Sequence, residues 1–174
     1  MAELAARWLY VEGVVLVRPG KAADIDDAVS LYERSNLARR QGAWPGQAAR
    51  VDHVRERLRD PDTWLLVATE GPEMVAMTSA RALREQDGEG AVIPGGCFLG
   101  FMYVAPERWG RGIGGALLDA VLAEAERRLQ PRIHLLTHPD NERSQRLYRS
   151  RGFSPTGRSG DGQEEWVRAP GIPS

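Results

Sequence analysis

Cysteine and long apolar runs are nearly absent from this chain of 174 residues. Its single cysteine, Cys97, rules out an internal disulfide framework and favours a reducing compartment. No apolar run approaches the roughly 20 residues that a membrane-spanning helix needs, and the first residues carry an early acid instead of a signal peptide's apolar segment. We therefore expect a cytoplasmic protein that has no membrane partner.

An excess of charge of one sign is also lacking. The 23 Lys and Arg residues are balanced by 24 Asp and Glu residues, for a net charge of -1, so we expect no nucleic-acid partner. His134 and His138 lie four residues apart but straddle the end of an expected strand, so we expect no metal site. The length suits one domain, at residues 13–169, with a flexible leader at 1–12 and a tail at 170–174.

The spacing of apolar residues predicts alternating strands and helices. The expected strands span residues 14–18, 64–69, 74–80, 97–104, 133–137 and 165–168, and one more near Phe153 stays open. The first expected helix begins after Asp24, and the others span residues 47–59, 113–129 and 141–151. Residues 84–96 are polar and rich in glycine, so we expect a long surface loop there. This order predicts an α/β domain with a mixed central sheet and helices on both faces.

A glycine-rich segment, residues 106–118, joins an apolar strand to an amphipathic helix. Its glycines at 110, 112, 114 and 115 expose backbone N–H groups at the positive end of a helix dipole, which suits a phosphate. Arg108 and Arg111 add charges that can pair with phosphate. From the residues alone, a phosphate loop and a plain glycine-rich turn with two solvated arginines stay equally open.

Two other kinds of phosphate loop fit this segment poorly. The spacing Gly110-x-Gly112-x-x-Gly115 matches a dinucleotide loop, but residues 105–109 separate the strand from the first glycine. The next strand also lacks the terminal acid of that pattern, so a dinucleotide-binding oxidoreductase is disfavoured. No glycine-rich loop ends in Gly-Lys-Ser/Thr, as a nucleotide triphosphatase loop does.

Val104-x-Pro106 followed by Gly110-Arg111-Gly112-Ile113-Gly114 resembles the pyrophosphate loop of the GCN5-related N-acetyltransferases, the GNAT family. That loop has the core Gln/Arg-x-x-Gly-x-Gly/Ala, and Trp109 stands at the Gln/Arg position, with Arg108 one place earlier. The element order from Val14 to Val167 is also similar to the family's. The resemblance implies acetyl-CoA as acyl donor and no metal. It implies donor-binding residues at Met102, Tyr103, Val104, Arg108, Trp109, Gly110, Arg111, Gly112, Ile113, Gly114, Gly115 and Asn141.

A second motif, Asn141-x-x-Ser144-x-x-x-Tyr148-x-x-x-Gly152-Phe153, is also similar to the family's pattern. Asn141 and Tyr148 lie two helical turns apart and can face the same way. The resemblance implies that Tyr148 is catalytic, near the reacting sulfur, and that Asn141 contacts the donor. A helix cap at Asn141 and a core aromatic at Tyr148 are the structural alternatives.

These motifs predict an N-acetyltransferase that moves an acetyl group from acetyl-CoA to a primary amine of a small molecule or protein, by direct attack in a ternary complex. The family often places an acidic residue on its fourth strand to act as the base, and residues 97–104 hold none. The base is therefore unassigned: His138, Glu33 and Asp140 are candidates, and each can equally be a solvated or capping group. A non-catalytic acyl-CoA-binding module on the same fold is the alternative. The acceptor, the acyl-chain preference and a homodimer stay open.

Overall fold

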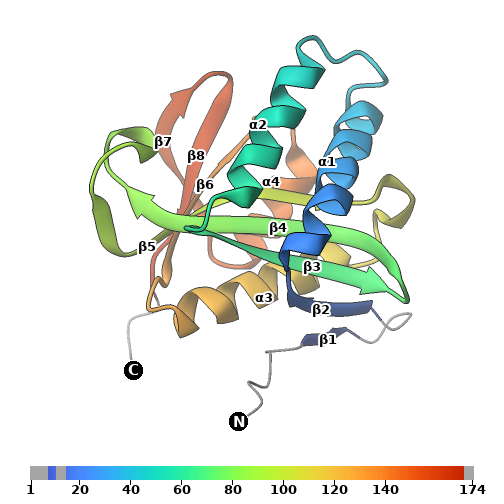
Figure 1. The fold of residues 1–174 in the computed structure, drawn as a ribbon. Coiled ribbons are helices and arrows are strands. Elements are labelled where there is room, and N and C mark those ends of the chain that lie inside the picture. The colour runs from blue at the N-terminus through green and yellow to red at the C-terminus, as the bar shows by residue number, and fades with distance from the viewer. Residues whose placement is uncertain (1–7, 11–14, 171–174) are drawn as a thin grey trace. The chain divides into compact units, whose positions relative to one another are not determined.

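The computed structural model describes residues 8–10 and 15–170 (Figure 1). The strands are β1 Trp8–Tyr10, β2 Val15–Pro19, β3 Thr63–Glu70, β4 Glu73–Arg84, β5 Val92–Val104, β6 Arg132–Thr137, β7 Ser154–Gly160 and β8 Gln163–Arg168. The α-helices are α1 Ile25–Arg39, α2 Gln47–Arg59, α3 Ile113–Arg127 and α4 Glu142–Ser150. Short 3-10 turns span Ala22–Asp24 (η1), Gln86–Gly88 (η2) and Pro106–Arg108 (η3). Within this described part, no helix combines the length and apolar character needed to cross a membrane.

The predicted helices and strands are all present, and the strand left open near Phe153 is β7. The loop expected at residues 84–96 was wrong, because β4 extends to Arg84 and β5 already begins at Val92. A strand pairs through its backbone and needs no apolar side chains, and a glycine here leaves room for the Leu83 side chain of the neighbouring strand. A Cβ on Gly96 would lie 3.0 Å from Cδ2 of Leu83.

The N-terminal strand β1 was not predicted. It pairs antiparallel with β2, with Leu9 opposite Leu16, so residues 8–10 of the expected leader belong to the sheet. The other leader residues lie outside the described part of the chain, as does the expected tail from residue 171.

The chain forms two compact units, each assembled from separate segments. The first unit comprises Met1–Ser79 and Phe101–Val121, and the second comprises Ala80–Gly100 and Leu122–Ser174. Strands β4 and β5 and helix α3 therefore contribute residues to both units.

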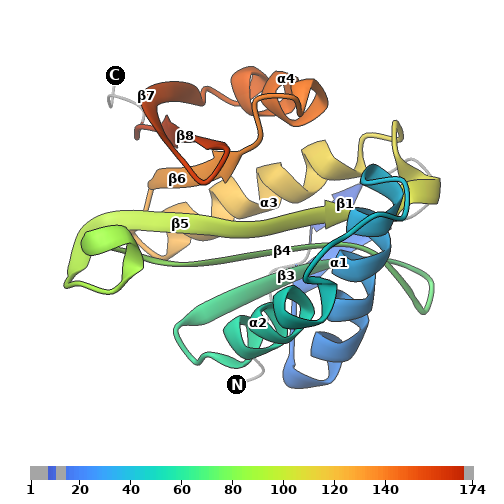
Figure 2. The ribbon, with the colours of Figure 1, turned by 90° about the horizontal axis from the view of Figure 1, so that it is seen from above.

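The first unit contains β1, β2, β3 and the start of β4, side by side in that order. Helices α1 and α2 lie on one side of these strands and the first part of α3 lies on the other (Figures 1 and 2). Arg18 of β2 donates two hydrogen bonds of 2.8 Å to the carboxylate of Asp24, which fixes the start of α1. The core under α1 and α2 is apolar and includes Ala28, Val29, Leu31, Val54, Leu58, Leu65, Val67 and Met77.

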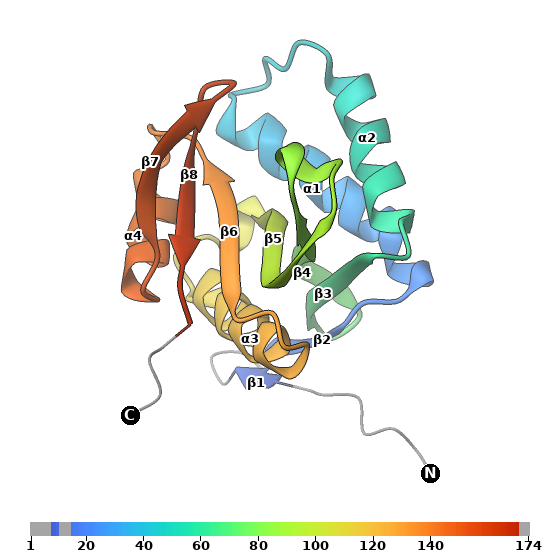
Figure 3. The same cartoon turned by 90° about the vertical axis from the view of Figure 1, so that its left-hand side faces the viewer.

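In the second unit, β5, β6, β8 and β7 are neighbours in that order, so the sheet is mixed (Figure 3). The β5–β6 pair is parallel and runs from Gly96 opposite Arg132 to Leu99 opposite Leu135, whereas β6–β8 and β7–β8 are antiparallel. Helix α4 packs on the face that carries Trp166, whose ring lies 4.9 Å from the Arg149 guanidinium carbon.

Candidate functional site

The loop between β5 and α3 makes a tight turn into the start of α3, and its residues belong to the first unit. Gly110 and Gly112 have φ angles of 84° and 77°, in the left-handed region that favours glycine. The N–H of Ala116 donates to the Gly112 carbonyl over 3.1 Å, so the helical hydrogen bonds begin there. The amides of residues 113–115 precede this first bond and have no intrahelical acceptor. These N–H groups lie at the positive end of the α3 dipole, which is an arrangement that can bind an anion.

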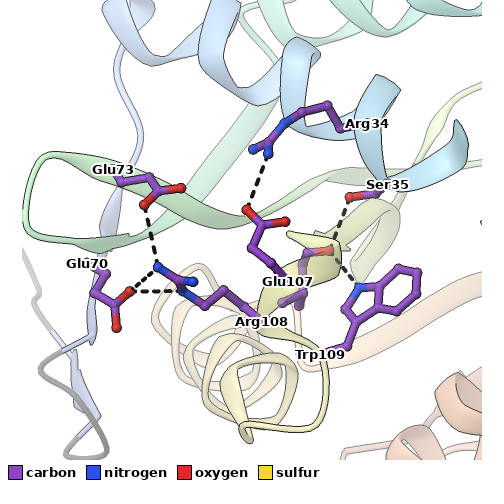
Figure 4. A network of polar contacts seen from close by, with 8 residues as sticks. Arg34, Ser35, Glu70, Glu73, Glu107, Arg108 and Trp109 are labelled. Carbon is purple, nitrogen blue, oxygen red and sulfur yellow. Dashed lines mark hydrogen bonds and ion pairs between the residues drawn. The ribbon is translucent and has the colours of Figure 1, made fainter. Parts of the chain in front are cut away.

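Trp109 supports this loop through its indole. Its Nε1–H donates to the Val104 carbonyl over 2.8 Å, and the same oxygen accepts the Ser35 hydroxyl at 3.1 Å (Figure 4). A carbonyl oxygen has two lone pairs, so Val104 has no acceptor capacity left for a ligand. The tryptophan at the family's Gln/Arg position thus holds the end of β5 against the loop.

Arg108 was predicted to pair with phosphate, and the structure gives its guanidinium two carboxylate partners (Figure 4). Its Nε lies 2.9 Å and its Nη2 2.6 Å from Oε2 of Glu70, and Nη2 lies 3.5 Å from Glu73. Both acids flank the β3–β4 turn, so Arg108 anchors η3 to that hairpin. Arg111 is exposed and directly precedes Gly112, so it stays a candidate for a phosphate contact.

Helix α1 holds the loop at a further point. Arg34 forms an ion pair of 3.3 Å with Glu107, and the neighbouring Ser35 is the residue bonded to Val104 (Figure 4). A hydrogen bond from its own backbone N–H, together with the Arg34 guanidinium, lowers the pKa of Glu107. The loop is therefore braced by α1 on one side and by the β3–β4 hairpin on the other, partners that the sequence did not reveal.

The side chain of Tyr103 belongs to an aromatic cluster in the first unit. Tyr32 lies at its centre, with ring centroids 5.0 Å from Tyr103, 5.9 Å from Phe101 and 5.4 Å from Trp44. Burial raises the pKa of Tyr32 to about 12 and also raises the pKa of Tyr103. These phenols stay protonated at neutral pH, and the predicted contact of Tyr103 with acetyl-CoA stays a prediction.

The two residues of the second motif lie in the second unit. Asn141 caps α4, because its Oδ1 accepts a hydrogen bond of 3.3 Å from the Ser144 N–H. Tyr148 is 7% exposed and packs against Phe153, with 5.7 Å between ring centroids. Both structural alternatives are thus present, and the proposed contacts of Asn141 and Tyr148 with the donor stay predictions.

The three candidate bases have unremarkable surroundings. His138 places Nδ1 3.3 Å from the Gly162 carbonyl, Glu33 accepts a hydrogen bond from Nε2 of Gln47, and Asp140 is exposed. Burial raises the pKa of the Cys97 thiol to about 12, so this cysteine is no nucleophile at neutral pH. Across residues 8–10 and 15–170 no group of three His, Cys, Asp or Glu side chains is placed to hold a metal ion.

The fold is that of an α/β protein, and its glycine-rich loop leads into the first amides of α3. A family model described as "Acetyltransferase (GNAT) family" matches residues 26–153. That match spans well over half of the chain, and the chain belongs to this family. Membership of this family supports acetyl transfer as the general chemistry of the protein.

Solved structures share the fold. The GNAT domain of S. lividans PAT is 25% identical, with a TM-score of 0.71 over 94% of this chain and 95% of that one. The PaiA N-acetyltransferase from Thermoplasma acidophilum, solved with coenzyme A, is 13% identical, with a TM-score of 0.68 over 88% and 98%. The ribosomal-protein-S18-alanine N-acetyltransferase from Escherichia coli is 19% identical, with a TM-score of 0.64 over 88% and 90%. No curated protein matches the chain.

Proposed function

We propose that this protein transfers an acetyl group from acetyl-CoA to a primary amine of a small molecule or a protein, by direct attack of the amine within a ternary complex. The observation that carries the proposal is the left-handed pair Gly110 and Gly112 ahead of α3, in a chain of the acetyltransferase family. A phosphate loop at that position has a use in acetyl transfer, because the donor carries a pyrophosphate.

The donor is held mainly by backbone groups. The leading amides of α3, at residues 113–115, bind the pyrophosphate, with the helix dipole and Arg111 adding positive potential. The pantetheine arm lies along Met102–Val104 as an added strand. Because the Val104 carbonyl already accepts from Trp109 and Ser35, the carbonyl that receives a pantetheine N–H is that of Met102.

The reaction needs one group that removes a proton and one that supplies a proton. An alkyl amine has a pKa of about 10.4, so only roughly one part in 10³ is free at neutral pH, and a base must take its proton. The amine nitrogen then bonds to the acetyl carbon, and the C–S bond breaks. Tyr148 donates its hydroxyl proton to the departing sulfur, which leaves as a thiol.

The decisive experiment measures release of the coenzyme A thiol from acetyl-CoA with a panel of polyamines, aminoglycosides and peptides with free amino groups. We expect release that depends on the amine, with one acetyl group added to the amine by mass spectrometry. Tight binding of coenzyme A without release for any amine would instead establish the non-catalytic module.

A pair of matched variants tests the loop. Gly114→Asp places a carboxylate among the leading amides and should weaken acetyl-CoA binding at least tenfold, or about 1.4 kcal/mol. Gly160→Asp is the control, because a Cβ on Gly160 of β7 would meet no atom within 4 Å. Circular dichroism should show that both variants are folded. Equal acetyl-CoA affinity in the two folded variants would remove the loop from the donor site.

A further inference from the structure

A hydrogen-bonded histidine and glutamate lie on the face of the second unit's sheet that is turned away from α4. His134 of β6 places Nδ1 3.1 Å from Oε1 of Glu165 on β8. In the antiparallel register, His134 is opposite Val167 and Leu136 is opposite Glu165, so these four side chains share one face. Trp166, the alternating residue, faces α4, and the pair therefore lies on the face turned away from that helix.

Glu165 is held as a carboxylate. Burial pushes its pKa up, but hydrogen bonds from His134 and Thr156 and the nearby Arg158 outweigh this effect and lower the pKa below its ordinary value. Thr156 donates to Oε2 over 2.8 Å, and Arg158 lies 3.8 Å from the same oxygen. Both partners come from β7, so the position of Glu165 is fixed by three side chains.

The chemistry of Glu165 sets the tautomer of His134. An ionised carboxylate only accepts hydrogen bonds, so Nδ1 of the imidazole carries the proton that is shared with it. In the neutral ring the lone pair then lies on Nε2, pointing away from Glu165. A carboxylate that fixes an imidazole in this way leaves the second nitrogen oriented to accept a proton from a substrate.

The ring of His134 is partly exposed and lies beside an exposed apolar side chain. Leu136, two residues further on the same face, is 43% exposed, and the His134 side chain is 19% exposed. The ring lies between Phe98, its parallel partner on β5, and Val167 on β8. Charged groups of this face in the second unit include Glu165, Arg158 and, by strand alternation from His134, Arg132.

We propose that His134 is the general base of the acetyl transfer and that Glu165 is the residue that positions it. This inference rests on the proposed function. The acceptor nitrogen starts as an ammonium ion and ends as an amide, so it loses two protons. Nε2 of His134 takes one of them and passes it to water. The other returns to Tyr148 and replaces the proton that Tyr148 gives to sulfur. The N–C bond forms and the C–S bond breaks, so the products are the amide, the free thiol and one proton.

The kinetic test compares His134→Gln with His53→Gln, an exposed histidine of α2. His134→Gln should lower kcat about 10²-fold at pH 7, within the usual range for a general base, with the KM for acetyl-CoA unchanged. The loss should shrink as the pH approaches the pKa of the amine, and should be smaller for a weakly basic amine, because more of the substrate is already free. Glu165→Gln should lower kcat less, and His53→Gln should match the wild type.

The outcomes separate this proposal from the proposed function. If the wild type transfers acetyl groups and His134→Gln keeps its full rate and pH profile, the base assignment alone is overturned. If the wild type transfers no acetyl group to any amine in the panel, both proposals fall. A loss in His134→Gln that is equal at every pH and for every amine would mark a structural role and overturn the assignment as well.

Nuclear magnetic resonance of the wild-type protein tests the geometry without catalysis or a substitution. The chain has three histidines, so the imidazole nitrogens can be assigned readily. His134 should carry its proton on Nδ1 in the neutral ring, and Glu165→Gln should change the shift of that nitrogen while those of His53 stay in place. An Nε2–H tautomer for His134 in the wild type would leave no lone pair on Nε2 and would overturn the proposal.

Discussion

The hydroxyl of Tyr148 is the only part of that residue that the proposed chemistry uses. Tyr148→Phe keeps the ring that packs against Phe153 and removes only the proton donor. We expect kcat to fall by roughly 10²-fold, the usual effect of losing a general acid, with little change in acetyl-CoA affinity or in the melting temperature. Steady-state kinetics, a binding isotherm and calorimetry on the same preparation give the three quantities.

The identity of the leaving thiol provides the control for Tyr148. A more acidic thiol leaves with less help, so the loss in Tyr148→Phe should be smaller with an acyl donor of that kind. Full kcat in Tyr148→Phe with a slow-leaving donor, under conditions where chemistry limits the rate, would reduce Tyr148 to a core aromatic.

The sequence identified residue types at the loop more reliably than it identified their partners. The glycine pattern predicted the turn into α3 because the left-handed φ angles of Gly110 and Gly112 are a local requirement of the chain. The role of Arg108 depends on Glu70, 38 residues earlier, and only folding brings the two together. The hydrogen bond from Trp109 to Val104 joins residues five apart, but it requires the turn of η3 between them.

At the scale of elements, Arg108 joins η3 to the β3–β4 hairpin. Substitutions at this contact can distinguish an arginine that anchors the loop from one that binds phosphate. If Arg108 only anchors the loop, Arg108→Ala and the double variant Glu70→Ala with Glu73→Ala should weaken acetyl-CoA binding to a similar extent. A loss of about threefold to tenfold corresponds to roughly 0.7–1.4 kcal/mol, the order of one partly exposed charged hydrogen bond. Isothermal titration calorimetry measures both.

Direct phosphate binding by Arg108 would produce the opposite pattern. Removing Glu70 and Glu73 would then release the guanidinium and strengthen acetyl-CoA binding, whereas Arg108→Ala would weaken it. Exposed Arg146 of α4, whose pairing with Glu142 involves side chains 68% and 78% exposed, supplies a control arginine for substitution by alanine.

Elements with local signals at their ends were predicted well. The bounds predicted for α2 coincide with those found, because Gly46 precedes the helix and Asp60-Pro61 follows it. The start of β5 was missed because residues 92–96 contain two glycines and a proline and show no apolar alternation. Strand β1 was missed because three residues are too few to show a period, and its register with β2 is what defines it.

At the scale of the whole molecule, the sequence predicted the order of the elements and the family. It did not predict that the chain forms two units whose segments alternate along the sequence. Each unit combines segments that are distant in sequence, and no local pattern marks the boundary within β4, β5 or α3. The pair His134 and Glu165 was missed for the same reason. Its partners lie 31 residues apart and meet only through the antiparallel register of β6 with β8.

The stability of the whole fold should depend on acid through carboxylates paired with arginine. The hydrogen bonds from Arg18 lower the pKa of Asp24, and those from Arg127 and Arg128 lower the pKa of Glu124. A carboxylate whose pKa is lower in the folded than in the unfolded state stabilises the fold above its unfolded pKa, and the contribution is lost as the pH falls through the folded value. The melting temperature should therefore fall steeply as the pH drops below the ordinary aspartate value of 3.8.

Asp24→Asn identifies how much of this acid sensitivity comes from the pair at the start of α1. The variant loses the two charge-assisted bonds from Arg18 and should be less stable than the wild type at pH 7 by about 2 kcal/mol, the range for hydrogen bonds to a charged group. As the pH falls from 3.8 through the lower pKa of folded Asp24, the wild type protonates this carboxylate and loses the same bonds, so the two melting temperatures should converge. Asp26→Asn is the control, because the Asp26 side chain is 79% exposed and its pairing with Arg55 should contribute little. Calorimetry between pH 7 and pH 2.5 measures all three proteins, and a constant gap between Asp24→Asn and the wild type over that range would show that Asp24 stabilises the fold without its charge.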